Sequence, residues 1–201
     1  NALNILVQNA STVGAIDLGF YNIDKNNNFI FFDKIKNKEF KLLYLVGSDN
    51  LEIKKSDEFI VYQGSHGDKN ASIADVILPS AAYTEQNGLF ENLEGRIQEC
   101  RKASYCTNQA LEDWKIFNLI NRNINSLDLF SDFLSIRKSS LQEIPNFSEI
   151  DMLPKKTPSI KTNASLEASN EKINIKNIDY YYSNSIARAS KTMSDCRNIS
   201  N

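Results

Sequence analysis

Three short apolar runs, each closed by a turn residue, constrain the fold of this chain more than any other feature. The runs cover residues 42–46, 59–62 and 74–78, and a glycine or proline follows each of them within two positions. Continuous apolar runs of this length are typical of strands that are buried on both faces. Three such strands with turns at their carboxyl ends predict an α/β fold with a parallel sheet. Ligands of such sheets gather at those carboxyl ends.

Helices are expected before and after the three strands in the sequence. A short strand at residues 5–7 precedes a predicted helix that runs from about Ser11 to Gly19, where glycine favours an end. Residues 108–124 predict a longer helix, with Glu112 and Asp113 early in it, where the helix dipole favours negative charge. Its apolar side chains recur at spacings of three and four and are expected to face the core; they are Leu111, Trp114, Phe117, Ile120 and Ile124.

Two stretches have a weaker pattern. Residues 21–38 are polar and rich in Asn and Lys, so a loop is expected, with a short strand or turn at the apolar residues 29–32. Gly88 and Gly95 bracket a stretch that predicts an irregular strand or a pair of loops.

We expect three parts along the chain. Residues 1–125 form the α/β part, and residues 126–172 form a long irregular arm or linker, rich in Ser, Lys and Asn, with one short helix near 128–138. Residues 173–201 form a C-terminal segment that contains a short helix at about 184–196.

Composition excludes several classes of protein. A net charge of −2 gives no overall basic field for nucleic acid. No apolar stretch approaches the roughly 20 residues that span a bilayer, and the first residues lack the basic start of a signal peptide. Three cysteines without a Cys-x-x-Cys pair argue against a disulfide framework or a cysteine-ligated cluster. The frequent Asn, Ile and Lys residues indicate an A/T-rich genome, as in an organelle.

Few residues are candidates for chemistry. His66 is the only histidine, so this chain cannot form a site with two histidine ligands. It lies in the loop Gly64–Asp68 after the second strand, where a phosphate-binding loop would lie, but the glycine spacing of such loops is absent. We weighed an acid/base role for His66 and prefer a turn residue bonded to neighbouring backbone.

Five charged residues are further candidates for chemistry. Asp75 interrupts an apolar run, so its carboxylate needs a partner, and a buried hydrogen bond to a nearby loop is preferred over catalysis. Around Gly88 and Gly95 stand three acids and one base, which could bind an anionic cofactor through the arginine or form a structural ion-pair network. We prefer the network; its members are Glu85, Glu91, Glu94 and Arg96.

Three motifs between residues 60 and 98 carry a family resemblance. The first is Tyr-Gln-Gly-Ser-His-Gly-Asp at 62–68, the second is Ala-Asp-Val-Ile-Leu-Pro at 74–79 followed by Glu-Gln-Asn-Gly, and the third is Asn-Leu-Glu-Gly-Arg-Ile-Gln at 92–98. In this order and spacing they resemble the molybdopterin-oxidoreductase superfamily. The resemblance implies that residues 1–125 are the C-terminal half of a molybdopterin-oxidoreductase-like α/β domain and contain its parallel sheet.

Other segments narrow the resemblance. The loop at 62–68, the helix start at 112–116 and the tail at 178–193 are similar to the large iron–sulfur subunit of respiratory complex I, the NADH:ubiquinone oxidoreductase. Residues 9–19 are similar to a helical segment of the same subunit, whereas residues 21–40 and 126–172 are not matched. The tail within 173–201 is accordingly expected to be a docking segment.

The resemblance implies a structural role. In that family an N-terminal region rich in cysteine ligates the iron–sulfur clusters, and the C-terminal domain has generally lost its cofactor and active site. We therefore expect no catalytic, cofactor-binding or metal-binding residue here, and a supporting place in the matrix arm of complex I, where clusters on other parts or chains carry electrons from NADH to quinone.

The expected partners are other complex I subunits, above all the iron–sulfur half of the same subunit, with no nucleic acid and no direct membrane span. That half is expected on a separate polypeptide, or else one longer chain carries both. The expected location is the matrix side of the mitochondrial inner membrane, with an organelle gene. A fragment of an active molybdopterin oxidoreductase, of the formate dehydrogenase or nitrate reductase type, is the alternative, and a free-standing α/β binding protein is a third reading.

Overall fold

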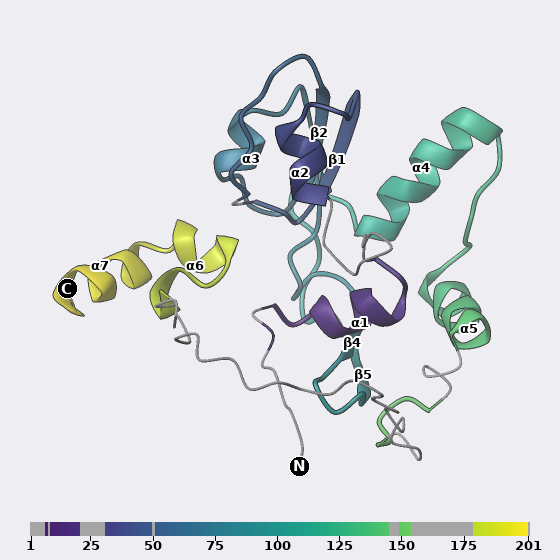
Figure 1. Ribbon diagram of the computed structural model, residues 1–201. Helices are drawn as coiled ribbons and strands as arrows, with labels where there is room; N and C mark the ends of the chain where they lie inside the picture. Colours follow the sequence, from purple (N-terminus) through teal and green to yellow (C-terminus); the bar gives the residue numbers. More distant parts are fainter. Residues whose placement is uncertain are drawn as a thin grey trace, which may run out of the picture. The chain divides into compact units, whose positions relative to one another are not determined.

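The computed structural model describes residues 7, 9–20, 31–49, 51–144, 149–153 and 179–200 (Figure 1). The chain divides into two compact units, residues 1–154 and residues 155–201. The predicted strand at 5–7 falls almost entirely outside the described residues.

The first unit contains the predicted parallel sheet. Its strands are β1 (Leu42–Val46), β2 (Phe59–Gly64) and β3 (Val76–Pro79), in the order β1-β2-β3. Both pairs of neighbours are parallel, so the prediction from the three apolar runs is confirmed. Gly47 follows β1 with a φ of +61°, a conformation that suits glycine, which explains why the first run ends there.

One face of the sheet carries the core. Leu43 and Leu45 of β1 lie beside Ile60 and Tyr62 of β2, and none of the four is more than 5% exposed. The helices α2 (Phe31–Lys36) and α3 (Lys69–Ser72) pack on this face through Ile35 and Ala71.

The position of α2 corrects one prediction. Phe31 and Phe32, expected in a strand or turn, begin this helix. The spacing of four between Phe31 and Ile35 places both on one side of the helix; Phe31 contacts the Phe40 ring at 5.6 Å, and Ile35 packs against the core.

The opposite face is only partly covered. Helix α4 (Asp113–Asn125) packs on it through Phe117, whose ring stacks on Tyr44 with centroids 5.8 Å apart. Leu42 and Phe59 on the same face stay 57% and 47% exposed. The apolar runs predict strands that are buried on both faces. This is found at the centre of the sheet and not along its whole length.

A second substructure combines α1 (Thr12–Asp17) with a two-stranded hairpin (Figure 1). The hairpin pairs β4 (Gly88–Glu91) with β5 (Ile97–Cys100) in antiparallel register, so it is more regular than predicted. Helix α1 ends just before Gly19, as predicted. Gly19 has a φ of +81°, and the N–H groups of Gly19 and Phe20 donate to the carbonyls of Ile16 and Ala15, which forms a Schellman cap.

The remaining helices fall in the expected regions with shifted bounds. Helix α5 (Phe133–Glu143) lies inside the predicted arm and begins with a capping box between Asp132 and Ser135. Of that arm, residues 145–148 and 154–172 fall outside the described residues. None of the helices among the residues described is both long and apolar enough to cross a membrane.

The second unit is a small helical hook. A 3₁₀ turn, Tyr180–Tyr182, precedes α6 (Ser185–Ala189) and α7 (Lys191–Ser200), so the helix predicted at 184–196 is two short helices. The Arg197 side chain joins the two ends of the hook, because it lies 2.6 Å from the Asp179 carboxylate and over the Tyr182 ring.

Candidate functional site

The loop after β2 uses its polar groups to hold its own shape. The Tyr62 hydroxyl donates to the His66 carbonyl at 2.7 Å, and the Ser65 hydroxyl lies 3.0 Å from Nδ1 of His66. The Asp68 carboxylate accepts from the backbone N–H of Lys69 at 2.8 Å and caps α3. These contacts are those of a turn.

A cavity of about 590 Å³ lies beside this loop, at the carboxyl ends of β2 and β3. Its lining mixes hydroxyl, amide and apolar groups with His66 and one carboxylate, Glu85. None of the residues that line it is Lys or Arg. Oε2 of Glu85 accepts from the backbone N–H of Ala82 at 3.0 Å.

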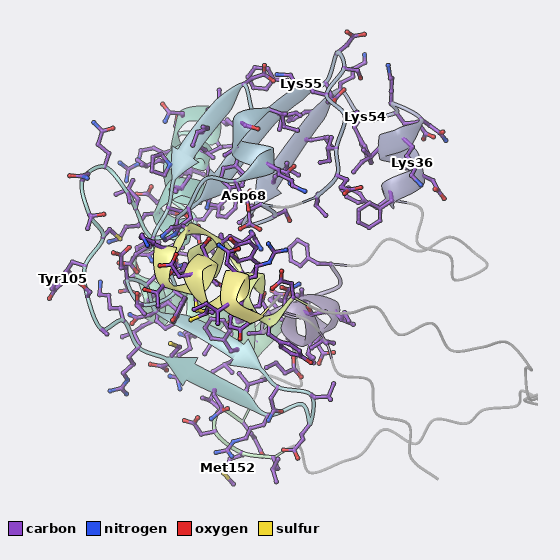
Figure 2. The ribbon with its side chains drawn as sticks, turned by 90° about the vertical axis from the view of Figure 1, so that its left-hand side faces the viewer. Lys36, Lys54, Lys55, Asp68, Tyr105 and Met152 are labelled. Carbon is purple, nitrogen blue, oxygen red and sulfur yellow. The ribbon has the colours of Figure 1, made fainter. Side chains whose placement is uncertain are left out.

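Asp75 lies at the other end of the sheet. Its carboxylate accepts from the backbone N–H of Ile60 at 2.8 Å and from the Lys55 ammonium at 2.5 Å. Figure 2 shows Lys55 at the opposite end of the strands from Asp68. The hydrogen bond from Lys55, followed by that from Ile60, lowers the pKa of Asp75. The predicted hydrogen bond to a nearby loop agrees with the Lys55 contact, but the predicted burial is wrong, because Asp75 is exposed. Asp75 and His66 do not share a site.

The predicted ion-pair network is not found. Among the described residues, no ion pair joins any two of Glu85, Glu91, Glu94 and Arg96. The backbone N–H groups of Glu94 and Arg96 both donate to the Asn92 side chain, at 2.9 and 3.0 Å, and shape the turn of the hairpin.

Glu91 has the most unusual environment of the four. It is 4% exposed and packs against α1, where a Cβ built on Gly14 would lie 3.6 Å from the Cβ of Glu91. Burial, then the charge of Asp17 and a hydrogen bond with that carboxyl, raise the pKa of Glu91 to about 7. Oε2 of Glu91 has no hydrogen-bond partner.

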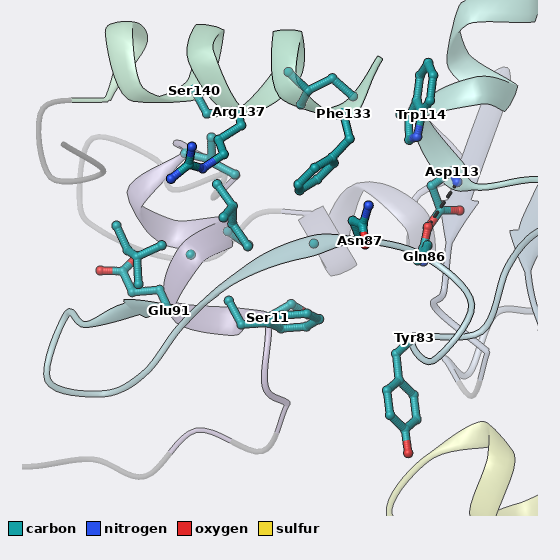
Figure 3. A pocket seen from close by; sticks show the side chains of 18 of the residues that line it. Ser11, Tyr83, Gln86, Asn87, Glu91, Asp113, Trp114, Phe133, Arg137 and Ser140 are labelled. Atoms are coloured by element: carbon teal, nitrogen blue, oxygen red, sulfur yellow. Dashed lines mark hydrogen bonds between the residues drawn. The ribbon is translucent and has the colours of Figure 1, made fainter. Parts of the chain in front are cut away.

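Sequence reasoning missed a buried polar chain that joins the sheet to α4. Gln63 is fully buried; its Oε1 accepts from the Tyr44 hydroxyl at 2.5 Å, and its Nε2 donates to Asp113 at 2.6 Å. Asp113 in turn accepts from Gln86 at 2.8 Å (Figure 3). Burial, together with the charge of Asp113, raises the pKa of Tyr44. An amide within the strand 59–64 was the signal, because a buried amide needs partners.

A second missed group is Glu112, which is 4% exposed. Lys102 and Lys115 donate to its carboxylate at 3.0 and 3.1 Å, and the Trp114 indole donates at 3.2 Å. Burial raises the pKa of Glu112, but the hydrogen bonds from these three side chains outweigh it, and the net shift is downward. The arrangement neutralises a buried charge and fixes the start of α4.

A second hollow is an apolar cavity of about 600 Å³, which we call the groove. Helices α1, α4 and α5 and strand β4 contribute most of its lining (Figure 3). Trp114 lines the groove and is half-buried, so its predicted place in the core is wrong. The buried residues of α4 are Ile116 and Asn118, because the apolar face expected from the sequence turns partly toward the groove.

The described residues offer no metal centre: no three His, Cys, Asp or Glu side chains among them gather closely enough to hold an ion. Cys100 and Cys106 are free thiols. Asp75, Glu112 and Asp113 are thus bonded within the fold, whereas Oε2 of Glu91 has no hydrogen-bond partner.

Comparison with known proteins adds two findings. Residues 1–123 match the family described as molybdopterin oxidoreductase. The chain is also similar to the NADH-ubiquinone oxidoreductase 75 kDa subunit of Reclinomonas americana, with 37% identity over 99% of this chain. An NADH-quinone oxidoreductase subunit of Rickettsia conorii is 38% identical over 96%, and the NADH dehydrogenase [ubiquinone] iron-sulfur protein 1 of Solanum tuberosum is 33% identical over 98%.

The match covers a minor share of each relative. This chain spans 29% of the Reclinomonas protein, 27% of the Rickettsia protein and 26% of the Solanum protein. The homology is to the C-terminal part of these subunits.

Proposed function

We propose that this chain, which belongs to the molybdopterin oxidoreductase family, is a structural, non-catalytic part of the large iron–sulfur subunit of respiratory complex I. The observation that carries the proposal is the similarity to complex I subunits of a protist, a bacterium and a plant along nearly the whole chain. The similarity extends beyond residue 123, where the match to the wider family ends.

The contacts of the candidate residues support a structural role. The Asp75 carboxylate is bonded to Lys55 and Ile60, Asp68 caps a helix, and Glu112 is held by two lysines. A group whose hydrogen bonds are made within the fold is poorly placed to transfer a proton to a substrate.

The cavity beside His66 does not fit the cofactor that the family name implies. Molybdopterin carries a phosphate, which proteins bind with cationic side chains or clustered N–H donors. The residues of this chain that line the cavity include no Lys or Arg and contribute the carboxylate of Glu85. We assign no step of chemistry to this cavity.

In this proposal the chain supports NADH-to-quinone electron transfer without carrying electrons itself. Its partner is the iron–sulfur half of the same subunit, on a separate polypeptide or upstream in one longer chain. The exposed apolar side chains of the sheet, Leu42 and Phe59, suit burial against such a partner. The location that follows is the matrix side of the mitochondrial inner membrane, with an organelle-encoded gene, and the parts 1–125, 126–172 and 173–201 act as domain, arm and docking segment.

Mass spectrometry of the purified respiratory complex tests the assignment. We expect this chain in stoichiometric amount with the other complex I subunits, and the same spectra identify the polypeptide that carries the iron–sulfur half. The alternative, a fragment of an active enzyme of the formate dehydrogenase or nitrate reductase type, requires a cofactor. One molybdenum or tungsten per complex by elemental analysis would overturn the structural role.

A variant tests the non-catalytic role directly. Because His66 makes only turn contacts, His66→Ala in an assembled complex should leave NADH oxidation within about twofold of the parent, which is roughly 0.4 kcal/mol of barrier. Assembly is measured first, by the amount of intact complex. Loss of turnover in a fully assembled complex would contradict the proposal.

A further inference from the structure

One four-residue pattern occurs at two places in this chain. Arg-Lys-Ala-Ser covers residues 101–104, and Arg-Lys-Ser-Ser covers residues 137–140. Each copy places an arginine three residues, and a lysine two residues, before a serine. Kinases that select substrates by charge read such a pattern, because acidic groups of the kinase bind the cations while the serine hydroxyl lies at the phosphate donor. The sequence therefore contains two equivalent candidate serines, Ser104 and Ser140, and the structure distinguishes them.

Ser104 lies in an exposed segment between β5 and α4. Its side chain is exposed, and it belongs to neither a helix nor a strand. The next residue, Tyr105, is 80% exposed and points away from the ribbon in Figure 2. The backbone N–H groups of Ala103 and Ser104 both donate to the carbonyl of Thr84, at 2.8 and 3.1 Å, and hold the segment along the surface. A second molecule can therefore reach the Ser104 hydroxyl.

The arginine of this segment is accessible as well. The Arg101 side chain is 86% exposed, and its Nε lies 3.6 Å from the Glu99 carboxylate, a long surface contact that contributes little. Lys102 differs, because its ammonium lies 3.0 Å from the carboxylate of the buried Glu112. Recognition of this segment by charge accordingly depends on Arg101 more than on Lys102.

The second copy of the pattern lies inside helix α5. Nε of Arg137 lies 3.2 Å from the Glu99 carboxylate, and Ser140 is half-buried and lines the groove (Figure 3). The helix also bonds the carbonyl of Ser140 to the N–H of Ile144 at 3.0 Å. A kinase takes its substrate segment in an extended conformation, so part of α5 would have to unwind before Ser140 could react, which costs free energy.

We propose that Ser104 is a phosphorylation site of the folded chain, for a serine kinase that binds the arginine three residues earlier, and that α5 protects Ser140. In the reaction the γ-phosphoryl group of a nucleoside triphosphate moves to Oγ of Ser104. The bond from the γ-phosphorus to the bridging oxygen breaks, a bond from phosphorus to Oγ forms, the hydroxyl proton goes to a carboxylate of the kinase, and the nucleoside diphosphate leaves. The site is independent of the proposed function, because only the exposed segment takes part.

Phosphorylation of the purified full chain tests the site. The chain is incubated with ATP, magnesium and the catalytic subunit of cAMP-dependent protein kinase, a kinase that selects basic patterns of this kind, and modified residues are mapped by mass spectrometry over time. We expect phosphate at Ser104 before any appears at Ser140. Ser140→Ala is the matched control and should leave the rate at Ser104 unchanged. Equal rates at the two serines, or an unmodified Ser104, would overturn the proposal.

Arg101→Ala tests recognition by charge. Because the Arg101 side chain is mostly exposed, its loss leaves the fold in place. The rate at Ser104 should fall on the order of tenfold, as expected for the loss of a charged contact with the kinase. Lys191→Ala, which removes an 88% exposed cation far away in sequence, is the control and should react like the parent. An unchanged rate in Arg101→Ala would contradict the proposed recognition.

Two synthetic peptides, residues 98–108 and residues 134–144, separate the effect of sequence from the effect of structure. Both carry the pattern outside the fold, so the kinase should modify Ser104 and Ser140 in them at comparable rates. The preference for Ser104 should then appear only in the full chain. A peptide 134–144 that stays unmodified would overturn the protection of Ser140 by α5.

Discussion

At the scale of single residues, Gly64 shows how closely the end of β2 is packed. A Cβ at this position would lie 2.5 Å from the hydroxyl oxygen of Tyr62 and 2.7 Å from its Cζ. The Tyr62 ring is 2% exposed, and its hydroxyl is bonded to the His66 carbonyl, so it has little freedom to move away.

Gly64→Ala should therefore lower the free energy of unfolding by about 1–3 kcal/mol, as overpacked cores do. Urea denaturation followed by circular dichroism measures the change. Gly67→Ala is the control in the same loop, because its Cβ would meet only Ala71 at 3.4 Å, an ordinary contact. Equal effects of the two substitutions would show that the Tyr62 ring yields.

The role of a residue was predictable where its type and its sequence neighbours alone indicate that it needs a hydrogen-bond partner. Asp75 stands in an apolar run, which predicts a partner, and the structure provides Lys55 and Ile60, although Asp75 itself is exposed. The raised pKa of Glu91 was not predictable, since its main cause is burial in the tertiary fold and the charge that adds to it, Asp17, is far away in sequence. The predicted ion-pair network was wrong because proximity in sequence does not fix the partner of a charge: the Glu85 carboxylate accepts from the backbone of Ala82, and Glu91 is buried against α1.

At the scale of elements, strands were easier to predict than helix boundaries. Each apolar run contains its own signal, whereas the start of α4 depends on tertiary contacts. Leu111 was expected inside the helix, but it bridges to Ser80, and its backbone bonds to Pro79 and Ala81 keep it extended beside β3. The helix accordingly begins at Asp113.

The revised face of α4 gives a testable ranking. Ile116 is 6% exposed and Ile124 is 73% exposed, although both are isoleucines of the same helix. Ile116→Ala should lower the free energy of unfolding by about 2–4 kcal/mol, because it leaves a cavity in the core. Ile124→Ala should change it by less than about 0.5 kcal/mol. Thermal unfolding of both variants checks the order, and a reversed order would contradict the assigned face.

At the scale of the whole molecule, the sheet exposes apolar side chains that a parallel sheet normally covers. Leu42 and Phe59 lie on the face that α4 leaves open. The sequence predicted full burial there because an apolar strand looks the same whether its own chain or a partner chain covers it. Under the proposed function the covering surface belongs to the iron–sulfur half of the subunit.

Phe59→Ser should accordingly weaken association with that half, and it should lower the free energy of unfolding of the chain itself by about 2 kcal/mol, because roughly half of the Phe59 side chain is buried within the chain. Co-purification of the two halves after co-expression measures the association. Tyr105→Ser is the control, since Tyr105 is 80% exposed on a loop (Figure 2). Co-purification that falls equally in both variants would remove the sheet face as the interface.

The place of Trp114 has a spectroscopic consequence. It is the single tryptophan of the chain, and it lines the groove with its indole N–H fixed on Glu112. Indole emission shifts with the polarity around the ring. Excitation at wavelengths that tyrosine does not absorb therefore reports on the surroundings of Trp114 alone. The fluorescence of the unlabelled chain, and its quenching by iodide, therefore report how much water reaches the groove in any assembly that the chain enters.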